Sequence, residues 1–95
     1  MTARSIEERE FAEKLTFNIA KALAMAPEGL PAESLVALVR VGVSPPPHVS
    51  AQRVRELIEE TRARMEAEGG IEKRPGPPVR YALTDAGRRK WARPF

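Results

Sequence analysis

The sequence predicts a mainly α-helical fold with a small β-hairpin, an α+β arrangement of three helices, the hairpin and a short C-terminal helix. Apolar residues recur at helical spacing through three segments before residue 70. Beyond residue 70, two short stretches that read IEKR and VRYAL are joined by PGPP, which is typical of a hairpin with a stiff tip. The length of 95 residues leaves room for a single domain, so we expect residues 1–95 to form one unit.

The first helix is expected over about residues 5–26. Ser5 followed by Glu8 fits a capping box, and Pro27 and Gly29 are typical of a helix end. The helix has two apolar faces: the first holds Phe11, Leu15, Ile19, Ala22 and Ala26, and the second holds Ile6, Phe17, Ala20 and Ala24. A helix that is apolar on both sides is buried on both sides. We therefore interpret the second face, together with Trp91, as a candidate dimer face, with cover by the C-terminus of the same chain as the alternative.

The second helix is expected over about residues 31–41. Pro31 suits a first helical position and Gly42 suits the residue just past a helix end. The side chains expected to face the core are Leu35, Leu38 and Val39.

The stretch SPPPHVS leads to the third helix, because three consecutive prolines cannot lie inside a helix. Either Ser44 caps a helix that begins at Pro45, or a stiff loop runs on to a cap at Ser50, and we prefer the second. The third helix is then expected over about residues 50–68, ending at Gly69-Gly70. Its buried stripe consists of Val54, Leu57, Ile58, Thr61 and Met65.

The hairpin is expected over about residues 71–83. In its second segment Val79, Tyr81 and Leu83 share one face, whereas Arg80 and Ala82 share the other. Thr84 then caps a last helix over about residues 84–93, which is anchored by Trp91.

Charge is distributed unevenly along the chain, although the net charge is only +3. Residues 1–70 hold nine Lys/Arg against eleven Asp/Glu, a net of −2, and residues 71–95 hold seven against two, a net of +5. This asymmetry indicates that the C-terminal end meets a polyanion. A solvated basic tail is the alternative.

Several classes of function find no support in the residues. The chain has no cysteine, which excludes disulfides and cysteine-ligated zinc, and its single histidine, His48, lies beside prolines as a turn residue would. Gly69-Gly70 ends a helix, whereas phosphate-binding loops begin one. We therefore expect no enzyme activity, no metal, no cofactor and no small-molecule ligand. The charged N-terminus and the lack of a long apolar run predict a soluble, cytoplasmic protein that does not enter membranes.

The stretch from residue 28 to 90 resembles the winged helix-turn-helix domains of bacterial and archaeal transcription regulators, such as the PadR-like and MarR-like families. The strongest match runs from Gly69-Gly70-Ile71 through Tyr81-Ala-Leu83-Thr84-Asp-Ala-Gly87. In such families a recognition helix ends in a turn of glutamate, glycine and an apolar residue, and a wing and a Y-x-L-T-x-x-G helix start follow. Gly87 lacks a side chain, so the last helix can pack close to its neighbour.

The resemblance implies that helix three enters the major groove of DNA while the wing lies along the phosphates. Two features depart from the pattern: SPPPHVS is longer than the usual turn, and the outer face of helix three carries Glu56, Glu59 and Glu60. Only the N-terminal turns of the helix are then expected to enter the groove. The candidate base contacts are Ser50, Gln52, Arg53 and Arg55, and the candidate phosphate contacts are Lys73, Arg74, Arg80, Arg88 and Arg89.

Each group of contacts has a plainer interpretation. Arg53 and Arg55 can pair with Glu56, Glu59 or Glu60 at helical spacing. The wing cations can serve solubility alone, and Arg88 and Arg89 can simply face water.

The resulting hypothesis is a small homodimeric transcription regulator that binds double-stranded DNA and is therefore associated with the nucleoid. The alternative is a winged-helix module for protein–protein interaction in a replication, transcription or chromosome assembly, which the acidic outer face of helix three and the doubly apolar first helix favour. An RNA-associated winged helix is compatible with the basic C-terminus, but no specific residue supports it.

Overall fold

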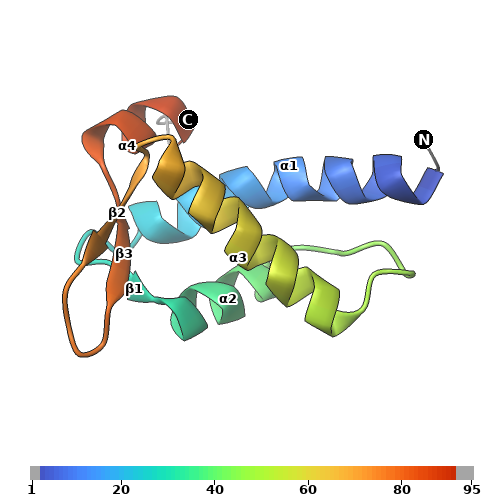
Figure 1. The fold of residues 1–95 in the computed structure, drawn as a ribbon, viewed down its shortest axis with the longest axis horizontal. Coiled ribbons are helices and arrows are strands. Elements are labelled where there is room, and N and C mark those ends of the chain that lie inside the picture. The colour runs from blue at the N-terminus through green and yellow to red at the C-terminus, as the bar shows by residue number, and fades with distance from the viewer. Residues whose placement is uncertain (1–2, 92–95) are drawn as a thin grey trace.

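The computed structural model describes residues 3–91 and contains four helices and three strands within them. Their order is α1 (Ala3–Ala24), β1 (Leu30–Pro31), α2 (Ala32–Val41), α3 (Ala51–Ala67), β2 (Ile71–Arg74), β3 (Arg80–Leu83) and α4 (Asp85–Trp91). A mainly helical chain with a small antiparallel sheet is therefore confirmed. The sheet and α4 lie at one end of the molecule, and α1 extends from them as the longest element (Figure 1).

Helix α1 supplies the centre of the core, because it packs against α2, α3, α4 and β3. The buried side chains Phe11, Leu15 and Ile19 confirm the first predicted face. The second face is only partly as expected, since Ala20 has 0% exposure and belongs to the core of the chain itself. The helix begins at Ala3, so Ser5 lies inside it and is not the predicted cap.

Helix α2 is short and strongly amphipathic. Pro31 stands at its N-cap and Gly42 at its C-cap, where the Gly42 N–H donates to the carbonyl of Val39. Leu35 and Val39 are buried as predicted, together with Val36. Leu38 is not buried: 53% of it is exposed.

Helix α3 begins at Ala51, after a loop that runs to a cap at Ser50, as the preferred interpretation of SPPPHVS predicts. The hydroxyl of Ser50 accepts a hydrogen bond from the Arg53 N–H at 3.1 Å, so Ser50 is the N-cap and residues 42–50 form the connecting loop. The predicted stripe is buried without exception: Val54, Leu57, Ile58, Thr61 and Met65.

The sheet has three strands in the order β1-β3-β2, one more than the predicted hairpin. The added strand β1 is only two residues long, and Leu30 and Pro31 pair with Tyr81 and Arg80. Ala82 is buried like its neighbour Leu83, although the two side chains lie on opposite faces of the sheet. Val79 precedes β3 and is exposed, so it does not join Tyr81 and Leu83 on the core side.

The end of α3 is closed by a Schellman motif. The Gly70 N–H donates to the carbonyl of Met65 and the Gly69 N–H donates to that of Glu66, both at 3.0 Å. Gly69 has φ +84°, a conformation that side chains rarely adopt. The chain is thereby turned sharply from α3 into β2.

Thr84 joins this turn to the start of α4. Its hydroxyl donates to the Gly69 carbonyl at 2.7 Å and accepts from the Gly87 N–H at 3.1 Å, as a helix cap does. Its N–H donates to the Gly70 carbonyl at 3.0 Å. One threonine therefore caps α4 and fastens it to the end of α3.

The glycine contact between Gly70 and Gly87 brings α4 directly onto the backbone of the turn. A Cβ atom on Gly87 would collide with the Gly70 carbonyl, and a Cβ atom on Gly70 would collide with the Trp91 ring. Trp91 is half-buried and packs on the hydrophobic core. The predicted close packing at Gly87 is confirmed, and its neighbour is Gly70.

We expect Gly87→Ala to destabilise the fold by about 1–3 kcal/mol, since the obstructing atom is backbone and the helix has to shift. Urea unfolding followed by circular dichroism measures this loss. Ala86→Ser, at the exposed neighbouring position, should stay within about 0.5 kcal/mol of the parent chain. Equal stability of the two variants would show that α4 does not press on the turn.

Thr84→Ala should cost about 1–2 kcal/mol, because it removes the cap acceptor and the donor to Gly69 together. Thr84→Ser keeps the hydroxyl and should recover most of that loss in the same unfolding measurement. A serine variant as unstable as the alanine variant would mean that the methyl group, and not the hydroxyl, accounts for the effect.

Candidate nucleic-acid interface

The start of α3 carries the four residues predicted to contact bases. Ser50 is used as the helix cap, so its hydroxyl oxygen already accepts a backbone hydrogen bond. Gln52 is exposed, and within residues 3–91 its amide has no hydrogen-bond partner. Of these four residues, Gln52 alone has a side chain that is fully available to an external partner.

Arg53 is held by three carboxylates from two helices. Its Nη2 lies 2.7 Å and its Nε 3.2 Å from Oε1 of Glu8 on α1, while Nη1 lies 3.4 Å from both Glu56 and Glu60 on its own helix. The hydrogen bond with Glu8, followed by the charges of Glu8 and Glu60, raises the pKa of Arg53. The guanidinium therefore ties α3 to α1 and is not held ready for a base.

Arg55 makes the equivalent connection to α2. Its guanidinium bonds to Glu33 near the start of α2 and lies 3.4 Å from Glu59 on α3. The pKa of Arg55 is raised, mainly by the hydrogen bond with Glu33. The ion pairs predicted by helical spacing are present, because Glu56 and Glu60 lie beside Arg53 and Glu59 lies beside Arg55. The further partners Glu8 and Glu33 come from other helices, and spacing along α3 does not predict them.

Helix α3 as a whole is balanced in charge. It holds four arginines and four glutamates, and the glutamates are Glu56, Glu59, Glu60 and Glu66. Arg62 bonds to Glu66 at 2.8 Å and lies 4.1 Å over the Tyr81 ring. Arg64 donates to the buried Thr16 hydroxyl on α1 at 2.6 Å. The outer surface of α3 beyond its first turns therefore offers no excess of positive charge.

The three hairpin cations lie on two faces of the sheet. Strand register places Lys73 opposite Tyr81 and Arg74 opposite Arg80, and directly opposed residues share a face. Arg74, predicted as a phosphate contact, is engaged within the chain, because it donates to Glu72 at 3.1 Å and to the Pro27 carbonyl at 2.8 Å. Lys73 and Arg80 have no acidic partner among residues 3–91.

Helix α4 adds further exposed basic side chains. Arg88 and Arg89 are both exposed, and Arg88 has no acidic partner in the described part of the chain. The ammonium of Lys90 lies 4.0 Å from Glu68 and 5.1 Å from the Trp91 ring centre. Lys73, Arg80 and Arg88 thus remain as the cations of the C-terminal region with the least opposing charge.

The predicted dimer face is largely used inside the chain. Ala20 is fully buried, Ala24 and Trp91 pack on the core and are half-buried, and only Ile6 and Phe17 stand out as exposed apolar side chains. The alternative of cover by the C-terminus is correct for the part of this face that Trp91 and α4 occupy, because α4 packs against α1.

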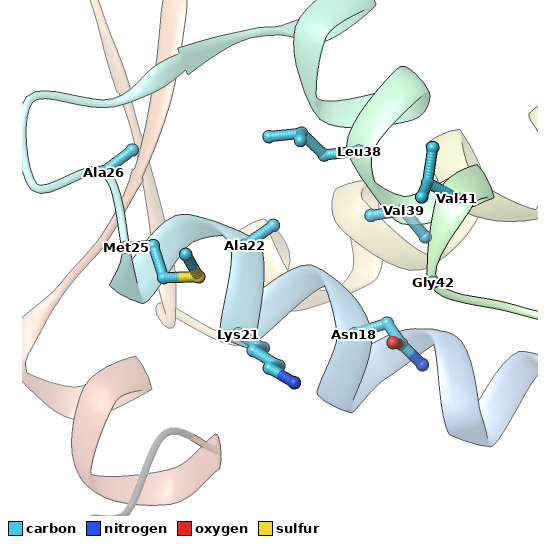
Figure 2. A pocket seen from close by; sticks show the side chains of 9 residues that line it. All are labelled: Asn18, Lys21, Ala22, Met25, Ala26, Leu38, Val39, Val41 and Gly42. Atoms are coloured by element: carbon cyan, nitrogen blue, oxygen red, sulfur yellow. The ribbon is translucent and has the colours of Figure 1, made fainter.

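An apolar groove between α1 and α2 was not predicted. Its volume is about 400 Å³, and Figure 2 shows side chains from both helices around it. The residues that line it are Asn18, Lys21, Ala22, Met25, Ala26, Leu38, Val39, Val41 and Gly42. The signal in the sequence is the run LVALVRVGV, which holds more apolar residues than one face of a short helix can bury.

Within residues 3–91, His, Cys, Asp and Glu form no group able to hold a metal ion. The helices in this range are too short or too polar to cross a membrane. Comparison of the chain with protein-family models, curated proteins and solved structures gives no match.

Proposed function

We propose that this chain is a winged helix-turn-helix domain that binds double-stranded DNA and acts as a transcription regulator at the nucleoid. The observation that carries the proposal is the set of unpaired cations Lys73, Arg80 and Arg88 within residues 71–91, whereas the four arginines of α3 all have acidic or polar partners. Unpaired cations can neutralise phosphates without first losing an internal ion pair.

The arrangement of the elements is compatible with this use. Three helices followed by a hairpin and a short helix is the order that the resemblance implies. In Figure 1 the tip of the β2–β3 hairpin and the N-terminal end of α3 both lie along the lower edge of the view. A duplex placed along that edge would meet the hairpin on one side and the first turn of α3 on the other.

The two elements would contribute unequally. Phosphate contact by the hairpin supplies most of the binding, because α3 is electrically balanced and its arginines are engaged. Helix α4 lies at the upper edge of the view in Figure 1, so Arg88 would reach only a longer or bent duplex. Base reading is confined to Gln52, unless Arg53 or Arg55 exchanges its glutamate for DNA. The domain would therefore prefer certain sequences only moderately.

We expect the chain to bind a mixed-sequence duplex in a fluorescence anisotropy titration, with an affinity that falls as salt rises. Lys73→Ala combined with Arg80→Ala should reduce the slope of log K against log salt by about 1.8, since each lost phosphate contact removes about 0.9. The matched control is Lys14→Ala with Arg40→Ala, which removes the same charge from exposed positions on α1 and α2. Undetectable binding at low salt, or equal losses in both double variants, would contradict the proposal.

The role of the first turns of α3 has its own test. Glu33→Gln removes the α2 partner of Arg55, and we expect tighter binding and a salt slope greater by about 0.9, because Arg55 becomes available to a phosphate. Glu10→Gln, at an exposed position of α1, changes the charge equally and should leave the slope unaltered. If both variants bind like the parent chain, the start of α3 does not touch DNA.

A protein-interaction module remains the second candidate, and a specific observation favours it. The outer face of α3 is lined by Glu56, Glu59, Glu60 and Glu66, a poor surface for a phosphate backbone and a suitable one for a basic protein. Such a module in a replication, transcription or chromosome assembly would fail to bind the duplex at low salt, so the same titration separates the two candidates.

A further inference from the structure

The groove between α1 and α2 has the size and the lining of a small-molecule site. Its volume of about 400 Å³ lies within the range of about 300–1,000 Å³ that is typical of ligand pockets. Asn18 and Lys21 are the only two polar residues among the nine that line it. Ligand pockets are lined in the same way, mostly by apolar side chains with a few polar groups that orient the ligand.

The apolar side chains of this groove are left in contact with solvent. Met25, Leu38 and Val41 line it and are 79%, 53% and 88% exposed. No other part of the chain within residues 3–91 covers them. Removal of this surface from water by an apolar ligand is therefore favourable.

Lys21 supplies the charge of the groove. Figure 2 shows Lys21 and Asn18 on the α1 side, with Leu38 and Val41 on the α2 side across from them. Lys21 is exposed, and its ammonium has no acidic partner among the described residues. A lysine can line an apolar surface with its methylene stem while the ammonium stays in water. The rim of the groove therefore carries a free positive charge beside an apolar trough.

No carboxylate of the described chain competes for this position. The other exposed charged side chains of α1, of α2 and of the turn between them do not line the groove, and they are Glu7, Arg9, Glu10, Glu13, Lys14, Glu28, Glu33 and Arg40. Charge complementarity at the groove itself therefore favours a ligand with one negative group.

We infer that the α1–α2 groove binds an unbranched aliphatic carboxylate of medium chain length, such as octanoate or decanoate. The carboxylate is ionised at pH 7 and pairs with the Lys21 ammonium. One amide hydrogen of Asn18 donates to the Lys14 carbonyl at 2.9 Å, so the second is available to the same carboxylate.

The hydrocarbon tail of the ligand lies against Met25, Leu38 and Val41. The groove has no aromatic side chain in its lining on which a ring would stack, whereas Met and branched aliphatic side chains adapt to a flexible chain. The composition of the lining therefore favours an aliphatic tail over an aromatic ring.

The test is a titration of the ¹⁵N-labelled chain with octanoate, without DNA, followed by two-dimensional NMR. We expect saturable shifts of the backbone amide signals of residues 18–26 and 38–42. Decanoate should bind about fourfold to sixteenfold more tightly than octanoate, because two further methylene groups leave water. Absence of binding, or shifts confined to the hairpin and α4, would overturn the inference.

Lys21→Gln tests the head group of the ligand. It should weaken octanoate binding by about threefold to fivefold, the effect of one exposed ion pair. 1-Octanol has the same tail without the charge, and it should bind the parent chain and this variant alike. The matched control is Lys14→Gln, which removes the same charge from α1 outside the groove and should bind octanoate normally. Equal losses in the two variants would mean that only the general field attracts the ligand, and would overturn the assignment to Lys21.

Leu38→Ser tests the tail. It should weaken octanoate and 1-octanol by at least about fivefold each, since an apolar wall of the groove is lost. Val79→Ser removes an exposed apolar side chain from outside the groove and should bind both compounds normally. Circular dichroism should show that both variants remain folded, because neither side chain belongs to the core.

Other occupants of the groove would give different results. Groove signals that change with protein concentration but not with octanoate would show that a second copy covers this surface, and would overturn the inference. Binding to anionic phospholipid vesicles without binding of monomeric octanoate would also overturn it. The inference does not rest on DNA binding, because the groove lies apart from the hairpin and its titration contains no duplex, so either proposal can fail while the other stands.

Discussion

The backbone contact between Gly70 and Gly87 is the constraint on which the C-terminal half of the structure depends. It lets α4 lie directly on the turn that ends α3, where Thr84 bonds to Gly69, Gly70 and Gly87 and Trp91 covers Gly70. The same turn starts β2, so the direction of the hairpin relative to α3 is set there. A larger residue at either glycine would separate α4 from the turn, and the hairpin would lose its fixed position beside the helix.

The ion pairs of α3 give a second constraint, which bears directly on function. Arg53 joins α3 to α1 through Glu8, and Arg55 joins it to α2 through Glu33. These side chains bridge the three helices at the surface of a mostly aliphatic core, so their charges are already paired within the chain. Exposed ion pairs of this kind contribute little to stability individually, so their exchange for an external phosphate is energetically accessible. In the C-terminal region, within residues 71–91, positive charge without an acidic partner remains at Lys73, Arg80 and Arg88.

Helix α1 separates two surfaces with different chemistry. One side of it is covered by α3 and α4, and the other carries Phe17 and borders the α1–α2 groove. A chain of this size can bury only a limited share of its apolar surface. The run of Val and Leu in α2 exceeds what the core can take up, and Leu38 and Val41 are left outside.

The sequence by itself determined the local elements of this protein, because helix caps, breakers and periodicity act over a few residues. Ser50, Thr84, the Gly69-Gly70 turn and the buried stripe of α3 all take the roles that their neighbours in the chain imply. Only the tertiary structure decided which residues meet across elements. Strand β1 exists because Leu30 and Pro31 lie beside β3. A segment of two residues has no sequence pattern from which a strand could be predicted. Ala20 is buried, and Leu38 is exposed, because the number of neighbours around each helix is set by the packing of the whole chain. Arg53 and Arg55 find Glu8 and Glu33 for the same reason: charge pairs between helices depend on distances in space that spacing along one helix does not contain.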